Sequence, residues 1–338
     1  MRLIIYALIF LFCQIAISQE KSNINSYEKG VKEFNDNNYA VAMILFSNEI
    51  KNSPLNSDAY YYLGLCKYHL QNITGAISDF NKCIALNPRY KDAYFYRGLC
   101  QISNNEKKAA FDSYTKIINL DSSYHEAYYY RGGLKFEFGL YSEAISDYDM
   151  VIKYNYKNAM AYNDRASAKR LINDLDGAIS DYLNSIRFDS TKAFIYNNIA
   201  SIYKIKKDYT KAIFYCNKAI SLDTNDYITI NNRGAIYFQM GNYEKAINDY
   251  NKVIEMNPSY SFAYNNRGSA KYKIGNYTGA ILDYSMAIEI DNNYGYAYLN
   301  RGISYKMKND FQNACVDWIK AKNLGVNQST ELINDNCK

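Results

Sequence analysis

Small and apolar residues recur along the chain with a period of 34 residues. Nine consecutive blocks, the first starting at Asn23, align without an insertion or deletion. Places within a block are numbered 1 to 34 from its first residue. Apolar residues fall at places 20, 21, 24, 27 and 28, which is the i, i+3, i+4, i+7 spacing of one helical face. The second half of each block is therefore predicted to be an amphipathic helix.

Turn and stop signals divide each block into two helices. Gly139, Gly241 and Gly275, with Asn or Lys at equivalent places of other blocks, mark a short turn before the second helix. The second helix is expected to end before place 32, because proline lacks an N–H and clashes with the preceding helical turn. All three prolines of the chain stand at that place: Pro54, Pro88 and Pro258.

Residue size indicates how the two helices pack. Place 8 is Gly or Ala and place 20 is Ala in all nine blocks, so two helices can approach closely there. Place 24 is aromatic in eight blocks, with Cys216 as the exception, and place 28 is Ile in eight, with Lys322 as the exception. Each block is predicted to be a helix–turn–helix that buries both faces only by stacking on its neighbours.

Segments such as "AYYYRGGLKFEFGLYSEAISDYDMVI" and "AYNNRGSAKYKIGNYTGAILDYSMAI" resemble the tetratricopeptide repeat, whose period is 34 residues. The resemblance runs from Asn23 to Asn327 and implies an all-α, right-handed α-solenoid of nine tandem helix–turn–helix repeats. It also implies a concave groove, lined by the first helices, that holds an extended peptide or a partner helix. The repeats are expected to start at residues 23, 57, 91, 125, 159, 193, 227, 261 and 295.

Both ends of the chain differ from the array of residues 19–327. Residues 1–18 have the features of a signal peptide: Arg2, an apolar run from Leu3 to Phe12, and small residues at Ala16 and Ser18. Lipidation at Cys13 and an uncleaved anchor are weaker alternatives. We expect an exported protein, periplasmic, secreted or associated with a bacterial envelope, with no transmembrane segment once the leader is removed. Residues 328–338 are expected to form a capping tail with a short closing helix.

A second face of each first helix, at places 2, 5, 6, 9 and 12, is the candidate partner-binding groove. Blocks two to four carry acids at place 2 and aromatic rings at places 5 and 6. Later blocks carry asparagines there, whose amides both donate and accept hydrogen bonds and so suit a peptide backbone. A solvated polar face is the competing interpretation. The groove candidates are Asp58, Tyr61, Tyr62, Asp92, Phe95, Tyr96, Glu126, Tyr129, Tyr130, Asn163, Asn197, Asn198, Asn231, Asn232, Asn265, Asn266 and Asn300.

Six blocks carry Arg at place 7, where the tetratricopeptide family often has Leu, and five of the six carry Asp at place 23. This coincidence predicts a bridge between the two helices of one repeat. A basic ladder for an acidic ligand is the alternative. The arginines are Arg97, Arg131, Arg165, Arg233, Arg267 and Arg301, and the aspartates are Asp147, Asp181, Asp249, Asp283 and Asp317.

Composition narrows the function to binding. The formal net charge of +5 is too small to indicate nucleic acid by itself. Two histidines, no phosphate-binding glycine loop and no metal-ligand spacing argue against an enzyme, a metal site, a cofactor and a small-molecule substrate. The sequence therefore predicts a non-enzymatic scaffold for a protein or peptide partner, with nucleic acid unlikely from the exported location. Recognition of a polysaccharide or single-stranded nucleic acid through the aromatic ladder is the alternative.

The cysteines allow one disulfide prediction. Six cysteines remain after the leader, and most have the positions of small buried hydrophobes. Cys315 and Cys337 flank a segment that is able to turn back after Gly325, and an exported protein meets an oxidising compartment. A Cys315–Cys337 bridge and a frayed tail with free thiols are left as equal alternatives.

Overall fold

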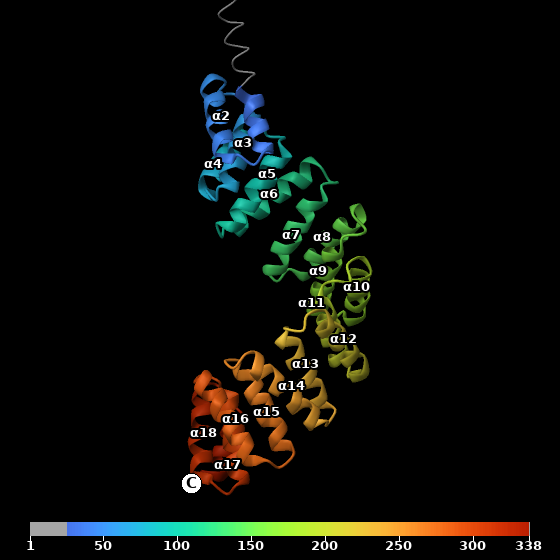
Figure 1. Ribbon diagram of the computed structural model, residues 1–338, viewed down its shortest axis with the longest axis vertical. Coiled ribbons are helices and arrows are strands. Elements are labelled where there is room, and N and C mark those ends of the chain that lie inside the picture. Colours follow the sequence, from blue (N-terminus) through green and yellow to red (C-terminus); the bar gives the residue numbers. More distant parts are fainter. Residues whose placement is uncertain (1–25, 338) are drawn as a thin grey trace, which may run out of the picture. The chain divides into compact units, whose positions relative to one another are not determined.

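The computed structural model describes residues 26–337, and every regular element within that range is a helix (Figure 1). Residues 26–35 are helical, and eighteen further helices follow from α2 to α19. No helix among these residues is long and apolar enough to cross a membrane. The predicted signal peptide, residues 1–18, lies outside the described residues.

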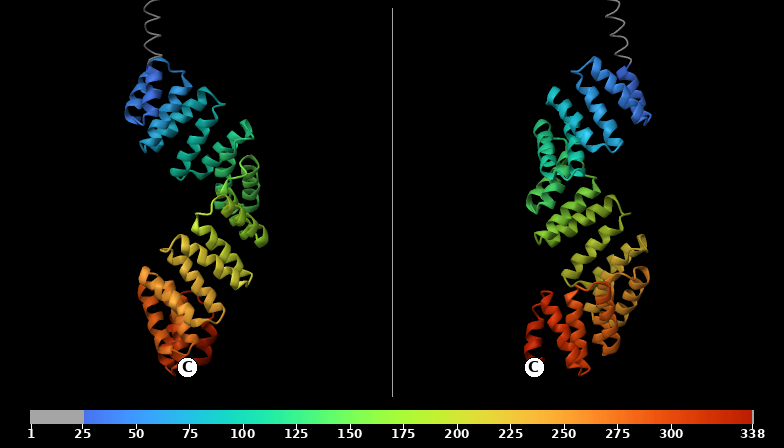
Figure 2. Two further views of the ribbon diagram at one scale, coloured as in Figure 1. Left: turned by 45° about the vertical axis from the view of Figure 1, so that its right-hand side comes forward. Right: turned by 90° about the vertical axis from the view of Figure 1, so that its left-hand side faces the viewer.

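The chain forms two compact units that divide between Ile172 and Asn173, inside repeat 5. In both views of Figure 2 the helices of each unit follow one another as antiparallel pairs. The first unit contains α2 (Tyr39–Asn52), α3 (Ser57–His69), α4 (Ile73–Leu86), α5 (Lys91–Ser103), α6 (Lys107–Leu120), α7 (His125–Glu137), α8 (Tyr141–Tyr154) and α9 (Ala159–Leu171). The second unit contains α10 (Leu175–Phe188), α11 (Ala193–Ile205), α12 (Tyr209–Leu222), α13 (Tyr227–Gln239), α14 (Tyr243–Met256), α15 (Ser261–Lys273), α16 (Tyr277–Ile290), α17 (Gly295–Met307), α18 (Phe311–Asn323) and α19 (Ser329–Asn336).

Within each unit, helices pack on their neighbours in the chain. Helix α3 packs on α4 and α4 on α5, and the same succession runs from α10 to α18 in the second unit. First helices of adjacent repeats also touch, as α3 does α5 and α11 does α13. This packing confirms the predicted all-α solenoid of helix–turn–helix repeats.

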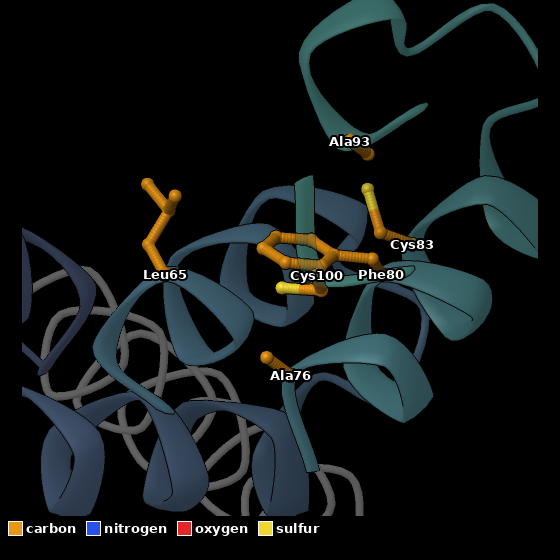
Figure 3. Close-up of a cluster of buried hydrophobic side chains, with 6 residues drawn as sticks. All are labelled: Leu65, Ala76, Phe80, Cys83, Ala93 and Cys100. Carbon is orange, nitrogen blue, oxygen red and sulfur yellow. The ribbon is translucent and has the colours of Figure 1, made fainter. Parts of the chain in front are cut away.

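The small residue at place 8 makes room for the aromatic ring at place 24. A Cβ added to Gly64 would lie 2.7 Å from Cε1 of Phe80, so any larger side chain would displace the ring. Phe80 is fully buried and stands in a cluster with side chains from α3, α4 and α5 (Figure 3). The members of that cluster are Leu65, Ala76, Phe80, Cys83, Ala93 and Cys100.

The turn between the two helices needs a left-handed backbone at place 15. Three repeats use glycine there, which adopts positive φ without a steric penalty, as Gly139 does at φ +77°. The other six place a residue with a Cβ at φ between 59° and 64°, a conformation that costs about 1–2 kcal/mol outside glycine. These six are Asn37, Gln71, Asn105, Asn173, Lys207 and Asn309.

The repeated arginine bridges helices, as the Arg–Asp pattern predicted. Arg233 donates from Nε and Nη2 to the two carboxylate oxygens of Asp249, at 2.9 and 2.6 Å, and Asp249 is buried. Its Nη1 donates to Asn217 of the preceding repeat at 2.7 Å. The fork thus joins both helices of one repeat to the repeat before it. The same two-oxygen bridge forms in Arg131–Asp147, Arg267–Asp283 and Arg301–Asp317.

The C-terminal segment folds back on the last repeat. Gly325 has φ +86°, which reverses the chain after α18, and α19 then packs on α18. Leu332 and Ile333 contact the buried cluster around Trp318. A disulfide joins Cys315 to Cys337, so the structure holds the bridged form of the tail rather than the frayed one.

Candidate partner-binding face

The predicted groove residues lie in one register along the first helices. A side chain at place 5 of one repeat meets the side chain at place 6 of the next repeat, 35 residues further along the chain. The contacts are aromatic in the first unit and hydrogen-bonded amides in the second. We call the surface formed by places 5 and 6 the inner face of each unit.

In the first unit the inner face is built from packed rings. Tyr61 meets Tyr96 edge to face at 6.1 Å between ring centroids, and Phe95 meets Tyr130 in the same way at 5.5 Å. Tyr130 also stacks on the buried ring of Tyr114 at 5.5 Å. Burial raises the pKa of the Tyr61 phenol far above its ordinary value, and the Asp92 carboxylate adds to the shift. These rings therefore stay neutral and serve the packing between repeats.

In the second unit the inner face is built from asparagine pairs. The amide Nδ2 at place 6 donates to the Oδ1 at place 5 of the preceding repeat, and all six side chains are half-buried or buried. Each such bond uses one of the two donors of one amide and one acceptor of the other. The pairs are Asn232 to Asn197 at 3.1 Å, Asn266 to Asn231 at 3.2 Å and Asn300 to Asn265 at 3.0 Å.

The aromatic run of the first unit ends at a carboxylate. Asp164, at place 6 of repeat 5, accepts a 2.8 Å hydrogen bond from the Tyr129 hydroxyl and a 3.0 Å bond from Nδ2 of Asn163. Burial raises the pKa of Asp164, and these two hydrogen bonds oppose that rise. The sequence pattern missed Asp164, although its position, 35 residues after Tyr129, is the signal that identifies it.

The acids at place 2 are partly engaged within the chain. Asp92 accepts a 3.1 Å hydrogen bond from the Tyr124 hydroxyl, and a Glu126 carboxylate oxygen lies 3.3 Å from Nδ1 of His125. Asp58 and Asp92 both keep exposed side chains on the first turn of their helices. These carboxylates stand at the edge of the inner face and leave it negatively charged in repeats 2 to 4.

Cavities open along the inner face at equivalent places. One, of about 220 Å³, lies in the first unit and is lined by Tyr129, Gly133 and Asp164 among others. Two more lie in the second unit: about 180 Å³ beside Asn197 and Asn232, and about 230 Å³ beside Asn300. Each includes a place 6 residue, a place 9 residue and the place 24 residue of the second helix. The inner face is therefore indented at the repeat period.

The predicted site residues divide into those that the structure brings together and those that it does not. The rings of repeats 2 to 4 form one contact series, and six of the asparagines form three pairs. Asn163 bonds to Asp164 instead of a second asparagine, and Asn198 is in none of the three pairs. Within residues 26–337, no group of three or more His, Cys, Asp or Glu side chains is arranged to hold a metal ion.

Comparison with protein families assigns the repeats. Models described as "Tetratricopeptide repeat" match residues 57–90, 92–122, 129–193, 193–226 and 227–260, and a model described as "TPR repeat" matches residues 268–309. The chain belongs to the tetratricopeptide repeat family. Three matches, at 57–90, 193–226 and 227–260, have the same bounds as repeats 2, 6 and 7 of the sequence pattern.

Three solved structures share the fold of this chain at sequence identities of 20% or less. The C-terminal part of a TPR repeat-containing protein from Cytophaga hutchinsonii is 20% identical, with a TM-score of 0.60, over 72% of this chain and 99% of that chain. A chain of the APC/C hetero-tetramer Cut9–Hcn1 is 13% identical, with a TM-score of 0.56, over 93% and 76%. Pseudomonas aeruginosa PilF is 18% identical, with a TM-score of 0.54, over 64% and 98%. The search of curated proteins found no match.

Proposed function

We propose that this chain is a non-enzymatic scaffold, exported from a bacterial cell, that binds a partner protein or peptide along the inner face of its repeats. The observation that carries the proposal is the series of cavities at equivalent places of that face, about one side chain in size each. Repeated indentations on rigid helices suit successive side chains of an extended polypeptide. The export part rests on the apolar leader of the sequence alone.

The asparagine pairs support a backbone-binding role. In each pair the second Nδ2 hydrogen and the remaining lone pairs are not used by the bond between repeats. A peptide backbone offers both donors and acceptors, so a row of half-buried amides can hold it without selecting its side chains. The pairing also fixes the amides in place, which lowers the entropy that a ligand has to remove on binding.

One comparison is consistent with this role. A chain of the same fold occurs in the Cut9–Hcn1 hetero-tetramer, so a partner chain is part of that assembly. The alternative, a ring platform for a polysaccharide or single-stranded nucleic acid, fits the structure less well. Tyr96 stacks on Phe80 and makes edge contacts with Tyr61, Tyr68 and Phe95, so the ring is already engaged with four rings of this chain.

The test compares two triple variants of the mature protein. Replacing Asn197, Asn231 and Asn265 by Ala removes three acceptors of the inner face, and we expect a large loss of affinity for a displayed peptide selected against the native chain. The matched control replaces three exposed second-helix residues by Ala: Lys218, Asn248 and Glu289. Both variants should keep native far-ultraviolet circular dichroism. Equal affinity of the two variants for the selected peptide would reject the inner face as the binding site.

A further inference from the structure

Repeat 6 lacks a ring that every other repeat has. Its place 24 residue is Cys216, whereas each of the other eight repeats carries a ring there that is at most 2% exposed. Cys216 is itself fully buried and has a free thiol. The aromatic residues of the other repeats are Phe46, Phe80, Tyr114, Tyr148, Tyr182, Tyr250, Tyr284 and Trp318.

The complete repeats show where that ring lies. In repeat 3 the Tyr114 ring has its centroid 6.1 Å from that of Phe95, at place 5, and 5.5 Å from that of Tyr130, at place 6 of the next repeat. It also covers Gly98, at place 8, where an added Cβ would be 2.7 Å from its Cζ. Repeats 1 and 2 place their rings between the same three neighbours.

In repeat 6 these same three places surround an empty space. Asn197 and Ala200 stand at places 5 and 8 of repeat 6, and Asn232 stands at place 6 of repeat 7. Together with Cys216 they line the cavity of about 180 Å³. Ala200 carries a methyl group where seven of the eight repeats with a ring have Gly; the exception is Ala166 of repeat 5, which stands with the fully buried Tyr182. Ala at place 8 tolerates a buried ring, so the loss of the ring rather than the methyl opens this place. The cavities of repeats 4 and 8 lie beside a ring that is present, whereas the lining of this cavity includes the place 8 residue itself.

The lining of the cavity suits an apolar group. Ile205 and Ile236 contribute aliphatic walls, while Ser201 and Lys204 stand among the polar members. Burial raises the pKa of the Cys216 thiol to about 12, so the wall nearest the missing ring is neutral. An engineered apolar cavity of about 150 Å³ in another protein stays dry and binds benzene. A space of this size and character therefore accepts a six-membered ring.

We infer that this cavity receives an aromatic side chain of the partner polypeptide, which takes the place of the ring that repeat 6 lacks. Phe or Tyr fills this place in seven of the eight repeats that have a ring, so the surrounding backbone is shaped for a ring of that size. The cavity lies beside the Asn197–Asn232 pair, which leaves amide donors next to the backbone of the inserted residue. The inference rests on the proposed function and names the anchor residue of the ligand.

The first experiment uses small aromatic probes and needs no partner. Binding of 4-fluorotoluene to the full mature chain is followed by fluorine NMR, and binding of p-cresol by ligand-observed proton NMR. The comparison variant combines Ala200→Gly with Cys216→Tyr and is called the filled variant. It rebuilds the Gly–Tyr pair of repeats 7 and 8, so we expect it to fold. Cys216→Ser is the control that leaves the cavity open.

We expect both probes to bind the native chain and the Cys216→Ser variant, and to bind the filled variant at least about tenfold more weakly. A thiol-alkylating reagent is then added, and modification of Cys216 is measured by peptide mass mapping. Slower alkylation of Cys216 when either probe is bound locates the binding in this cavity. Equal binding to native and filled chains, or binding without protection of Cys216, would overturn the inference. A filled variant that fails to fold leaves the thiol protection in the native chain as the deciding measurement.

A second experiment separates this inference from the proposed function. A displayed peptide that binds the native chain is compared with versions in which each aromatic residue is replaced by Ala. We expect one replacement to weaken binding to the native chain by about tenfold or more, and to have little effect on the filled variant. A selected peptide that binds the inner face with no such aromatic residue would overturn the anchor and leave the scaffold function standing. Failure of the asparagine triple variant to weaken binding would instead reject the proposed function.

Discussion

Gly234 is the position where a single methyl group tests the packing of the repeat most directly. It stands at place 8 of repeat 7, and an added Cβ would lie 2.8 Å from Cε1 and 3.1 Å from Cζ of Tyr250. Favourable carbon–carbon contacts begin near 3.5 Å, so either the ring or the helix has to move. Tyr250 is only 1% exposed and cannot swing into solvent. The substitution Gly234→Ala is therefore an overpacking change in a closed site.

Two opposing contributions set the expected magnitude. Alanine is favoured over glycine inside a helix by about 1 kcal/mol, which would stabilise the variant. Overpacking of a tight core costs about 1–3 kcal/mol, and the short distances at Gly234 favour the upper part of that range. We expect Gly234→Ala to lower the free energy of unfolding by about 1–2 kcal/mol.

Gly133 provides the matched control. It is also helical, and nothing lies within 4 Å of an added Cβ, so Gly133→Ala keeps only the favourable contribution of about 1 kcal/mol. Repeat arrays do not always unfold in one step, so urea denaturation by circular dichroism is combined with hydrogen exchange of the α13 and α14 amides. Equal or greater stability of Gly234→Ala than of Gly133→Ala would refute the packing argument.

Repeat 6 suggests a rescue of the Gly234 variant. Its natural pair, Ala200 and Cys216, combines the methyl group with a small residue at place 24. Adding Tyr250→Cys to Gly234→Ala should therefore cost less than the sum of the two single changes, by roughly 1 kcal/mol in a double-mutant cycle. Additive effects would show that the ring and place 8 do not compete for the same space.

Three further outcomes follow from the packing. Ala246→Leu should lower the unfolding free energy by about 1–3 kcal/mol, because Ala246 is fully buried; thermal unfolding that matches the native chain would contradict this. Asp249→Ala alone should lower the unfolding free energy by about 3 kcal/mol, because it leaves the Arg233 guanidinium without its partner. The double change Asp249→Leu with Arg233→Met should lower it much less, as measured by urea denaturation. Equal losses would mean that the bridge itself stabilises the repeat. Replacing Cys315 and Cys337 by Ser should lower the unfolding free energy by around 3 kcal/mol in the chain-entropy model and speed hydrogen exchange in α19. Free thiols at both positions in native protein, found by non-reducing peptide mapping, would contradict the bridge.

The sequence alone determined the repeat architecture, because 34-residue periodicity places the same residue type at the same point of every helix pair. Gly or Ala at place 8, Ala at place 20 and an aromatic residue at place 24 specify one local packing solution, and nine copies repeat it. The Arg–Asp bridge was predictable for the same reason: two places that vary together within a block lie in contact. Periodicity is strongest for interactions inside one repeat, since both partners then share a block.

The tertiary structure decided what lies between repeats. Only the stacking of first helices shows that place 5 of one repeat meets place 6 of the next. The asparagines that form a row in the sequence are therefore pairs in the structure, and Asp164 ends the aromatic run. The division at Ile172 has no counterpart in the periodic pattern, which continues through repeat 5 without a break. Cys216 is visible in the sequence as an exception, but the cavity is not. Whether a missing ring leaves a space or is filled by its neighbours depends on side chains from two repeats, and only the packed structure brings them together.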